Sequence, residues 1–164
     1  MDLAFRGESQ HKVDQKGRVS IPADFRQIII QGDPDCTPGA LPKFTIVYGD
    51  ERLRCLKCYT EKAMRRIDAE ISELQRSSPE RRYLQHFFQT RSVRVVLDPT
   101  GRLVLGNTLK EKVKFDDHVW FAGTGDSFEI WGSDSYRQHC SDLESMFRDG
   151  ESVEDPMSLI DGSY

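Results

Sequence analysis

Two arginines occupy the same place in a repeated run of five residues. Arg18 ends "DQKGR" at 14–18, and Arg102 ends "DPTGR" at 98–102. A guanidinium group can donate to both N7 and O6 of guanine in the major groove, so an arginine at a chain reversal suits base recognition. It can instead form an ion pair with the aspartate of its own run. We favour base recognition for Arg18 and the ion pair for Arg102, with the other role left open for each.

The first four residues of each run are typical of a tight turn. A type I turn prefers Asp at its first position, Pro at its second and Gly at its fourth. Asp14 and Gly17 match two of these preferences, whereas Asp98, Pro99 and Gly101 match all three. Strand-like residues lie on both sides, which predicts β-hairpin-like turns with the arginine leading the return strand. Turn geometry explains the Asp and Gly positions and leaves the arginines to be explained.

Further cations surround the first run more densely than the second. Lysines mainly hold phosphates, which gives an affinity for DNA that falls with salt. We therefore expect Lys16 and Lys12 to contact phosphates, with Arg6 flanking them. The basic residues near the first run are Arg6, Lys12, Lys16, Arg18 and Arg26, and those near the second are Arg94, Arg102 and Lys110, with Thr100 where Lys16 stands.

The elements that position the two runs also repeat. In each half of the chain, the residue pattern predicts the same order of elements: strand, turn, strand, short helix, strand, turn, strand. The short helices are expected at 23–30, with Pro22 suited to the first turn, and at 107–113, with Asn107 as N-cap. Glycine-turn hairpins follow each helix. The expected organisation is a first unit at 5–59 with a surface insertion at 31–43, connecting helices at 60–90, a second unit at 91–135, and a C-terminal helix with an acidic tail at 136–164.

Two longer helices are expected to join the halves. Thr60 is a predicted N-cap of a helix with an apolar stripe, and Ser78 is a predicted N-cap with Pro79 at the first helical position. The stripe of the first of these helices is Met64, Ile67, Ile71 and Leu74. An amphipathic stretch at 136–147 is expected to pack beside them. Because one half has little core of its own, we predict an α+β, mainly β fold in which two tandem units share one barrel.

The overall charge conceals an uneven distribution. The chain of 164 residues has a formal net charge of −4, but residues 134–164 contain eight acids and two arginines and so carry −6, which leaves +2 for residues 1–133. Nucleic acid is not excluded as a partner, because binding depends on where charge lies. The tail is expected to be solvated or loosely ordered. The absence of a long apolar run or a secretory signal predicts a cytoplasmic protein with reduced cysteines.

The sequence offers little to support catalysis or a cofactor. Cys55 and Cys58 form a lone CxxC, but a three-residue step on a strand sends side chains to opposite faces, so a zinc site is disfavoured. The further conceivable ligands are Cys36, Cys140 and His139. The run "GTGDS" at 123–127 lacks the lysine and spacing of a phosphate-binding loop. We therefore expect that the protein is not an enzyme and that it binds no cofactor, no metal and no small-molecule substrate.

The chain resembles the MraZ family, which is similar to the AbrB and SpoVT class of bacterial DNA-binding proteins. The resemblance covers about residues 5–135. Five motifs carry it in order: "FRG" at 5–7, "VDQKGRVSIPADFR" at 13–26, "PERR" at 79–82, "LDPTGRLVL" at 97–105 and "FEIW" at 128–131.

The resemblance implies a pseudo-twofold double-split, or swapped-hairpin, β-barrel assembled into ring-shaped homo-oligomers. It also implies a nucleoid-associated transcriptional regulator of its own cell-division and cell-wall operon, which binds short G-rich direct repeats in double-stranded DNA. Several hairpins meeting several boxes would raise affinity through effective concentration. The alternative is an AbrB-like protein-binding module of the antitoxin type that acts through its acidic tail.

Overall fold

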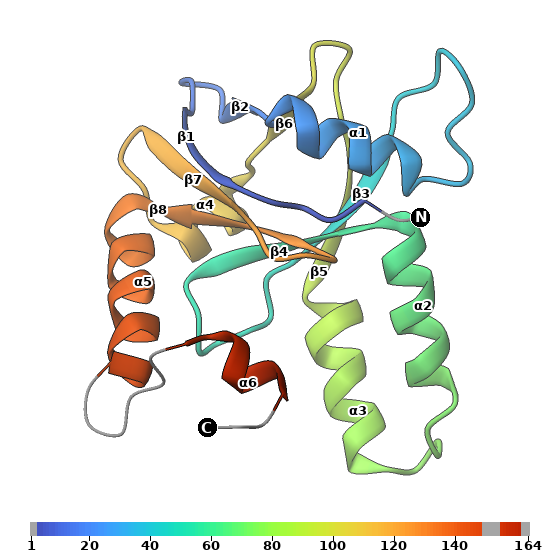
Figure 1. Ribbon diagram of the computed structural model, residues 1–164. Helices are drawn as coiled ribbons and strands as arrows, with labels where there is room; N and C mark the ends of the chain where they lie inside the picture. Colours follow the sequence, from blue (N-terminus) through green and yellow to red (C-terminus); the bar gives the residue numbers. More distant parts are fainter. Residues whose placement is uncertain (1–2, 149–154, 162–164) are drawn as a thin grey trace.

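The computed structural model describes residues 3–148 and 155–161 (Figure 1). The first half contains β1 (Glu8–Lys12), β2 (Arg18–Ser20), α1 (Ala23–Gln31), β3 (Lys43–Val47) and β4 (Cys55–Thr60). The connecting segment contains α2 (Glu61–Ser72), α3 (Pro79–Gln85) and the π-helical turn η1 (His86–Thr90). The second half contains β5 (Ser92–Val96), β6 (Arg102–Val104), α4 (Asn107–Val113), β7 (His118–Gly123) and β8 (Phe128–Gly132), followed by α5 (Ser133–Arg148) and α6 (Met157–Asp161).

The strands form two antiparallel sheets whose order is internally symmetric. The large sheet runs β1-β7-β8-β4-β3-β5, and the small ladder pairs β2 with β6. If each strand is exchanged for its counterpart in the other half (β1 for β5, β2 for β6, β3 for β7, β4 for β8), the large order is read backwards and the small ladder maps onto itself. The fold is therefore α+β with mainly antiparallel sheet, as expected. Within the described residues the large sheet ends at β1 and β5, so the strand pairing does not record a closed barrel.

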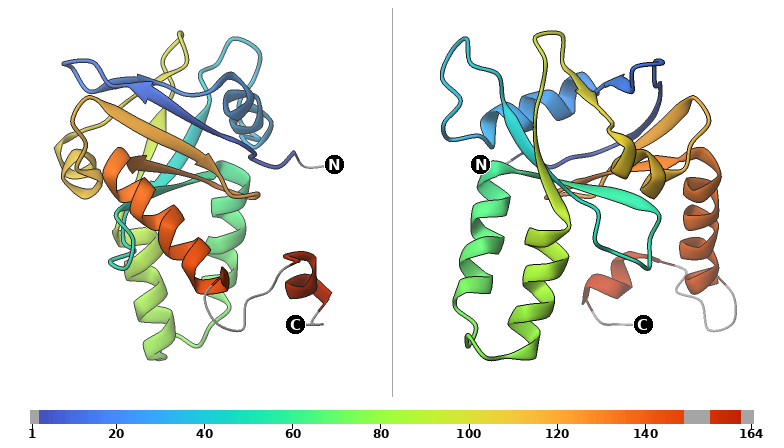
Figure 2. Two further views of the ribbon diagram at one scale, coloured as in Figure 1. Left: turned by 60° about the vertical axis from the view of Figure 1, so that its left-hand side comes forward. Right: turned by 180° about the vertical axis from the view of Figure 1, so that it is seen from behind.

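The two D-x-x-G-R turns do not join paired strands, which corrects the expected hairpins. Each turn is closed locally, since the Gly17 amide donates to the Asp14 carbonyl at 3.0 Å and the Gly101 amide donates to the Asp98 carbonyl at 3.0 Å. Beyond the turn the strands part: β1 pairs with β7, β5 pairs with β3, and β2 and β6 pair with each other. Each half thus completes its sheet with strands of the other half. Both turns project from the end of the molecule opposite α2 and α3 (Figures 1 and 2).

One hydrophobic core serves both halves. Val19 and Leu103, the middle residues of the small ladder, are each 1% exposed and belong to the same cluster as the buried face of the large sheet. Phe128 of β8 is a central member, with its ring 5.0 Å from the ring of Phe5 and 5.1 Å from that of Phe25, both in the first half. Neither half could bury these side chains alone.

The connecting helices begin where the sequence predicts. Thr60 caps α2 through its hydroxyl, which accepts from the Ala63 amide at 3.1 Å, and Ser78 caps α3, with Pro79 as the first helical residue. The expected cap at Asn107 is wrong: α4 begins at this residue, and Gly106 holds the cap position without a side-chain bond. Pro22 likewise stands at the cap position of α1, before the first turn.

Helix α5 packs on β7 and β8, not beside the connecting helices as expected. Aromatic side chains hold it there, since the rings of Trp131 and His139 stack at 4.3 Å and those of Trp120 and Tyr136 at 5.3 Å. The expectation of a solvated tail falls partly on 149–154 and 162–164, which lie outside the described residues. The described part of the tail contains α6, which was not predicted from the sequence. Within the described segments no helix has the length and apolar character to cross a bilayer.

Candidate nucleic-acid interface

The first turn is built around the Asp14 carboxylate. Its Oδ1 accepts from the backbone amides of Lys16 and Arg18, each at 2.9 Å, and its Oδ2 accepts from Arg18 Nε at 2.7 Å. These contacts lower the pKa of Asp14, with the Arg18 backbone amide as the largest cause. Gly17 adopts a φ of +79°, a left-handed conformation that favours glycine. The aspartate is therefore ionised at neutral pH and fixes both the turn and the arginine.

The second turn repeats this arrangement. Asp98 Oδ1 accepts from the amides of Thr100 and Arg102 at 2.9 Å, and Oδ2 accepts from Arg102 Nε at 2.9 Å. The Thr100 hydroxyl adds a bond of 2.8 Å, and together these donors, the Arg102 amide first, lower the pKa of Asp98 to about 2. Gly101 has a φ of +78°. The shared Asp, Gly and Arg of the two runs therefore all take part in forming the turns. The terminal nitrogens of the two arginines do not.

The small ladder brings Arg18 and Arg102 onto one surface. Its register pairs Arg18 with Val104, Val19 with Leu103 and Ser20 with Arg102. Opposed residues of an antiparallel pair share a face, and alternate residues of a strand share a face. Both arginines therefore lie on the face opposite the buried Val19 and Leu103. The sequence did not predict that Arg18 and Arg102 share a face, because nothing in either run specifies that β2 pairs with β6.

Both ion pairs weighed from the sequence are present, and they leave part of each arginine available. The side chains of Arg18 and Arg102 are 35% and 33% exposed. Each uses Nε for its aspartate, and among the described residues the terminal nitrogens of both guanidinium groups make no hydrogen bond. The ion pair and a contact to a ligand are therefore compatible roles for the same side chain.

Two cations lie over the turn of the opposite half, where the sequence did not place them. Arg26 of α1 donates from Nη1 to the Thr100 carbonyl at 3.4 Å, and a Cβ added to Gly101 would lie 2.1 Å from Arg26 Nη1. Lys110 of α4 covers the first turn, with its Cε 3.1 Å from a Cβ added to Gly17. In the sequence Arg26 is nearer the first run and Lys110 is nearer the second, so each was grouped with the wrong turn. Their equal offset of nine residues after Gly17 and Gly101 was the available signal.

The remaining predicted cations are dispersed. Lys12 ends β1 just before the first turn and Lys16 lies within that turn, and both are exposed. Arg6 precedes β1, beside the isolated bridge between Phe5 and Gly125. An extended chain rises about 3.3 Å per residue, so Arg6 lies roughly 20 Å from Lys12. The structure thus groups Lys12 and Lys16 with Arg18 and leaves Arg6 apart.

Arg94, counted with the second run in the sequence, is committed elsewhere. Its Nε donates to Glu61 Oε1 at 3.2 Å, and Glu61 is only 4% exposed. The carboxylate also lies 3.5 Å from the Thr45 hydroxyl. Arg94 therefore helps to anchor the start of α2 against β3 and β5 and does not join the second turn.

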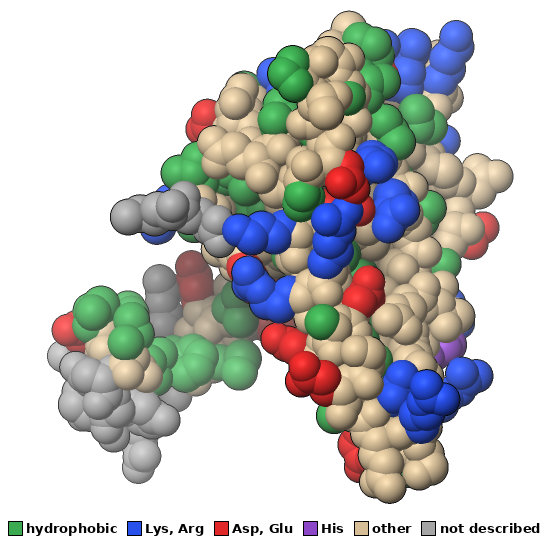
Figure 3. All heavy atoms as spheres, turned by 90° about the vertical axis from the view of Figure 1, so that its right-hand side faces the viewer, with side chains coloured by type: hydrophobic (Ala, Val, Ile, Leu, Met, Phe, Trp, Pro, Cys, Tyr) green, Lys and Arg blue, Asp and Glu red, His purple; other side chains and the backbone are tan. Residues whose placement is uncertain are grey.

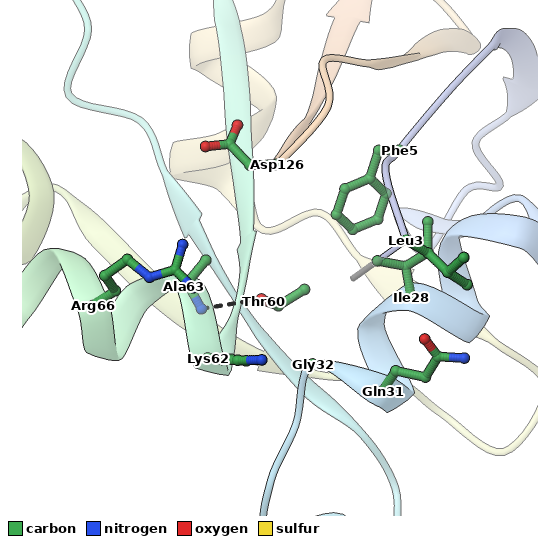
Figure 4. A pocket seen from close by; sticks show the side chains of 10 residues that line it. All are labelled: Leu3, Phe5, Ile28, Gln31, Gly32, Thr60, Lys62, Ala63, Arg66 and Asp126. Carbon is green, nitrogen blue, oxygen red and sulfur yellow. Dashed lines mark hydrogen bonds between the residues drawn. The ribbon is translucent and has the colours of Figure 1, made fainter. Parts of the chain in front are cut away.

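Other surfaces carry less concentrated chemistry. On the side of the molecule shown in Figure 3, Lys and Arg side chains adjoin Asp and Glu side chains. One ion pair that involves α2 joins Arg65 to Asp35 of the 32–42 loop at 2.5 Å. A hollow near the start of α2 measures about 90 Å³ and is lined by Leu3, Phe5 and Ile28 on one side and by Lys62, Arg66 and Asp126 on the other (Figure 4). Small-molecule sites usually measure about 300–1,000 Å³, so this hollow is too small to hold a substrate.

The cysteines remain thiols in this structure. Cys55 and Cys58 lie on β4, as predicted, and burial raises the pKa of Cys55 to about 12 and that of Cys58 well above its ordinary value. Within residues 3–148 and 155–161 no group of three or more His, Cys, Asp or Glu side chains is arranged to hold a metal ion.

The fold and the site define an internally duplicated α+β protein whose halves exchange strands and present two basic turns on one ladder. Comparison with known proteins identifies its family. The family described as "MraZ protein, putative antitoxin-like" matches residues 4–87. The chain is 42% identical over 164 residues to the transcriptional regulator MraZ of Ruegeria sp. (strain TM1040), covering 99% of this chain and 98% of that protein.

Two further relatives carry the same name. The transcriptional regulator MraZ of Ruegeria pomeroyi is 44% identical over 164 residues, again covering 99% of this chain and 98% of the relative. That of Lactiplantibacillus plantarum is 28% identical over 145 residues, covering 88% of this chain and 94% of the relative. The chain belongs to the MraZ family. These relatives are named as regulators and not as enzymes, in keeping with the expectation from the sequence.

Proposed function

We propose that this protein is a sequence-specific DNA-binding transcriptional regulator, acting as a repressor. The observation that carries the proposal is the common face of the β2–β6 ladder, on which Arg18 and Arg102 are each held by one nitrogen and keep two. The names of the relatives support it. A protruding basic turn fits the major groove, where bidentate arginine contacts discriminate guanine.

The proposed roles follow from position. Arg18 reads guanine, Arg102 is its counterpart on the second turn, and Lys16 and Lys12 hold phosphates of double-stranded DNA. Arg6 lies too far from the first turn to share its contacts. It can flank them only if the bound DNA extends along β1 as far as Arg6. The targets are short G-rich direct repeats at the promoter of the protein's own cell-division and cell-wall operon, on the nucleoid.

The proposed assembly supplies the affinity that one turn lacks. A ring-shaped homo-oligomer presents several turns to several boxes, so each further contact is made at high effective concentration. We propose that the two sheets of each subunit, together with the core that they share, form a double-split barrel. The proposed units are 5–59 with the 31–43 insertion, 60–90, 91–135 and 136–164.

Substitution of Arg18 tests this function. Arg18→Ala should weaken binding to a fluorescent duplex with repeated G-rich boxes by about ten- to a hundredfold, since a bidentate arginine–guanine pair contributes ~1–3 kcal/mol of discrimination. Binding to a scrambled duplex should change much less. Arg18→Lys keeps the charge and loses the bidentate geometry, so it should bind the scrambled duplex as wild type does but without the wild-type preference for the boxes. Equal anisotropy titrations for wild type and Arg18→Ala would refute the assignment.

A protein-binding module of the antitoxin type is the second candidate. The family description includes the word "antitoxin-like", and the C-terminal helices expose apolar side chains, with Met146 of α5 67% exposed and Ile160 of α6 78% exposed. In that case the boxes would have no effect at low salt, and a stoichiometric protein partner would co-purify with the full chain but not with a chain ending at residue 148.

A further inference from the structure

We propose that Arg26 and Lys110 are DNA-phosphate contacts, each serving the turn of the opposite half. Both belong to the short helix that follows a ladder strand, α1 after β2 and α4 after β6. The strand exchange carries each helix across to the other turn, so Arg26 covers Gly101 and Lys110 covers Gly17. This proposal rests on the proposed function and extends it to two residues outside the repeated runs.

Neither cation is neutralised where it lies. In the described part of the chain, no carboxylate lies within ion-pair distance of Arg26 or Lys110. The nearest candidate at the second turn, Asp98, is occupied by the amides of Thr100 and Arg102 and by Arg102 Nε. Arg26 makes one long bond of 3.4 Å to the Thr100 carbonyl, and its remaining donors are available to an anion. Both side chains are half-buried, which restricts them to the turn.

Their position favours phosphate over base. Arg18 and Arg102 occupy the ladder face, whereas Arg26 and Lys110 lie over the backbone of the turn tips. When a turn enters a groove, its flanks meet the sugar–phosphate strands that border the groove, and such contacts position the protein without reading sequence. The exchange gives each turn one cation from the other half, Lys110 at the first turn and Arg26 at the second, where Thr100 stands in place of Lys16.

The test measures binding against salt for the full-length protein. For each subunit that engages the DNA, Arg26→Gln and Lys110→Gln should each weaken binding about fivefold at ~0.15 M salt and reduce the magnitude of the slope of log K against log[salt] by ~0.9, the change expected when one phosphate is no longer neutralised. The loss should be equal for duplexes with and without G-rich boxes. Arg26→Lys should restore most of the slope. Arg76→Gln removes the same charge from the exposed loop between α2 and α3, remote from both turns, and should leave the slope unchanged.

The outcomes separate this proposal from the function on which it rests. If wild type binds neither duplex, the DNA-binding function itself fails. If wild type binds and both glutamine variants keep its slope, only the phosphate assignment is overturned. A loss confined to the G-rich duplex would make these residues base readers and would also overturn it. Thermal unfolding accompanies each titration, and should Arg26→Gln fold poorly, Lys110→Gln tests the same assignment on the other turn.

Discussion

At the scale of single residues, the aspartate of each turn organises everything around it. Asp14 and Asp98 each accept two backbone amides and one arginine Nε, so one carboxylate sets the turn and aims the guanidinium. The ion pair itself contributes little to stability, because water and salt screen an exposed pair. Its value lies in pre-ordering the arginine, which reduces the entropy lost when a ligand binds.

The acid dependence of stability tests this role of Asp98. Its pKa is about 2 in the folded protein against an ordinary 3.8, so the ionised carboxylate stabilises the fold at and above pH 3.8, and this contribution is lost as the pH falls towards 2. Asp98→Asn lacks the charge at every pH. The melting temperature of wild type should therefore exceed that of Asp98→Asn above about pH 4, and the gap should narrow steadily between about pH 4 and pH 2. A gap independent of pH in thermal melts would contradict the assignment.

The residue scale also shows what the sequence could predict. The tight turns at 14–17 and 98–101 follow from local residue preferences, although the hairpins expected around them are absent from the described strand pairing. The placement of Arg26 and Lys110 was wrong, since it depends on which half each helix packs against. Local patterns contain no information about that choice, and only the matching offsets within the repeat pointed to it.

At the scale of elements, the starts of α2 and α3 and the pairing within each glycine-turn hairpin were predictable, whereas the strand pairing between the halves was not. The hydroxyls of Thr60 and Ser78 fix helix ends through bonds made three residues away. Strand periodicity and glycine turns correctly predicted the β3–β4 and β7–β8 hairpins. Adjacency along the chain also suggested that β1 would pair with β2 and β5 with β6, which is wrong. Burial in the core decides the partner of β2, because pairing β2 with β6 buries Val19 and Leu103 against each other.

The turn glycines are constrained by the neighbouring half as well as by their own backbone. A Cβ on Gly17 would lie 2.7 Å from the Leu105 carbonyl oxygen, and φ is +79°. Gly39 has a φ of +87°, but a Cβ added there would meet no atom within 4 Å, so this position shares only the backbone strain. We expect Gly39→Ala to lower the free energy of unfolding by roughly 1–2 kcal/mol and Gly17→Ala by roughly 2–4 kcal/mol. Urea unfolding followed by circular dichroism measures both, and equal losses would show that the contact with the other half is unimportant.

At the scale of the whole molecule, the two halves form one cooperative body. Among the strands of residues 3–148, the β3–β4 and β7–β8 pairs are internal to a half, whereas the β1–β7, β3–β5, β4–β8 and β2–β6 pairs cross between halves. The aromatic cluster around Phe128 crosses as well. We therefore expect a change that loosens one half to displace the turn of the other.

The exchanged pairing predicts how the first half behaves alone. A fragment of residues 1–60 keeps the β3–β4 pair but loses the partners of β1 and β2, and an isolated two-stranded hairpin is marginal in water. The internal symmetry offers one remedy: two copies could pair β2 with β2, β4 with β4 and β1 with β3, restoring the observed strand order with a true twofold axis. The fragment should therefore be unfolded when dilute and gain β-structure only as a dimer, so its circular dichroism should depend on concentration. Light scattering gives the mass in the same samples. A monomer that is folded at every concentration would show that each half has its own core and that the exchange is not what holds the turns in place.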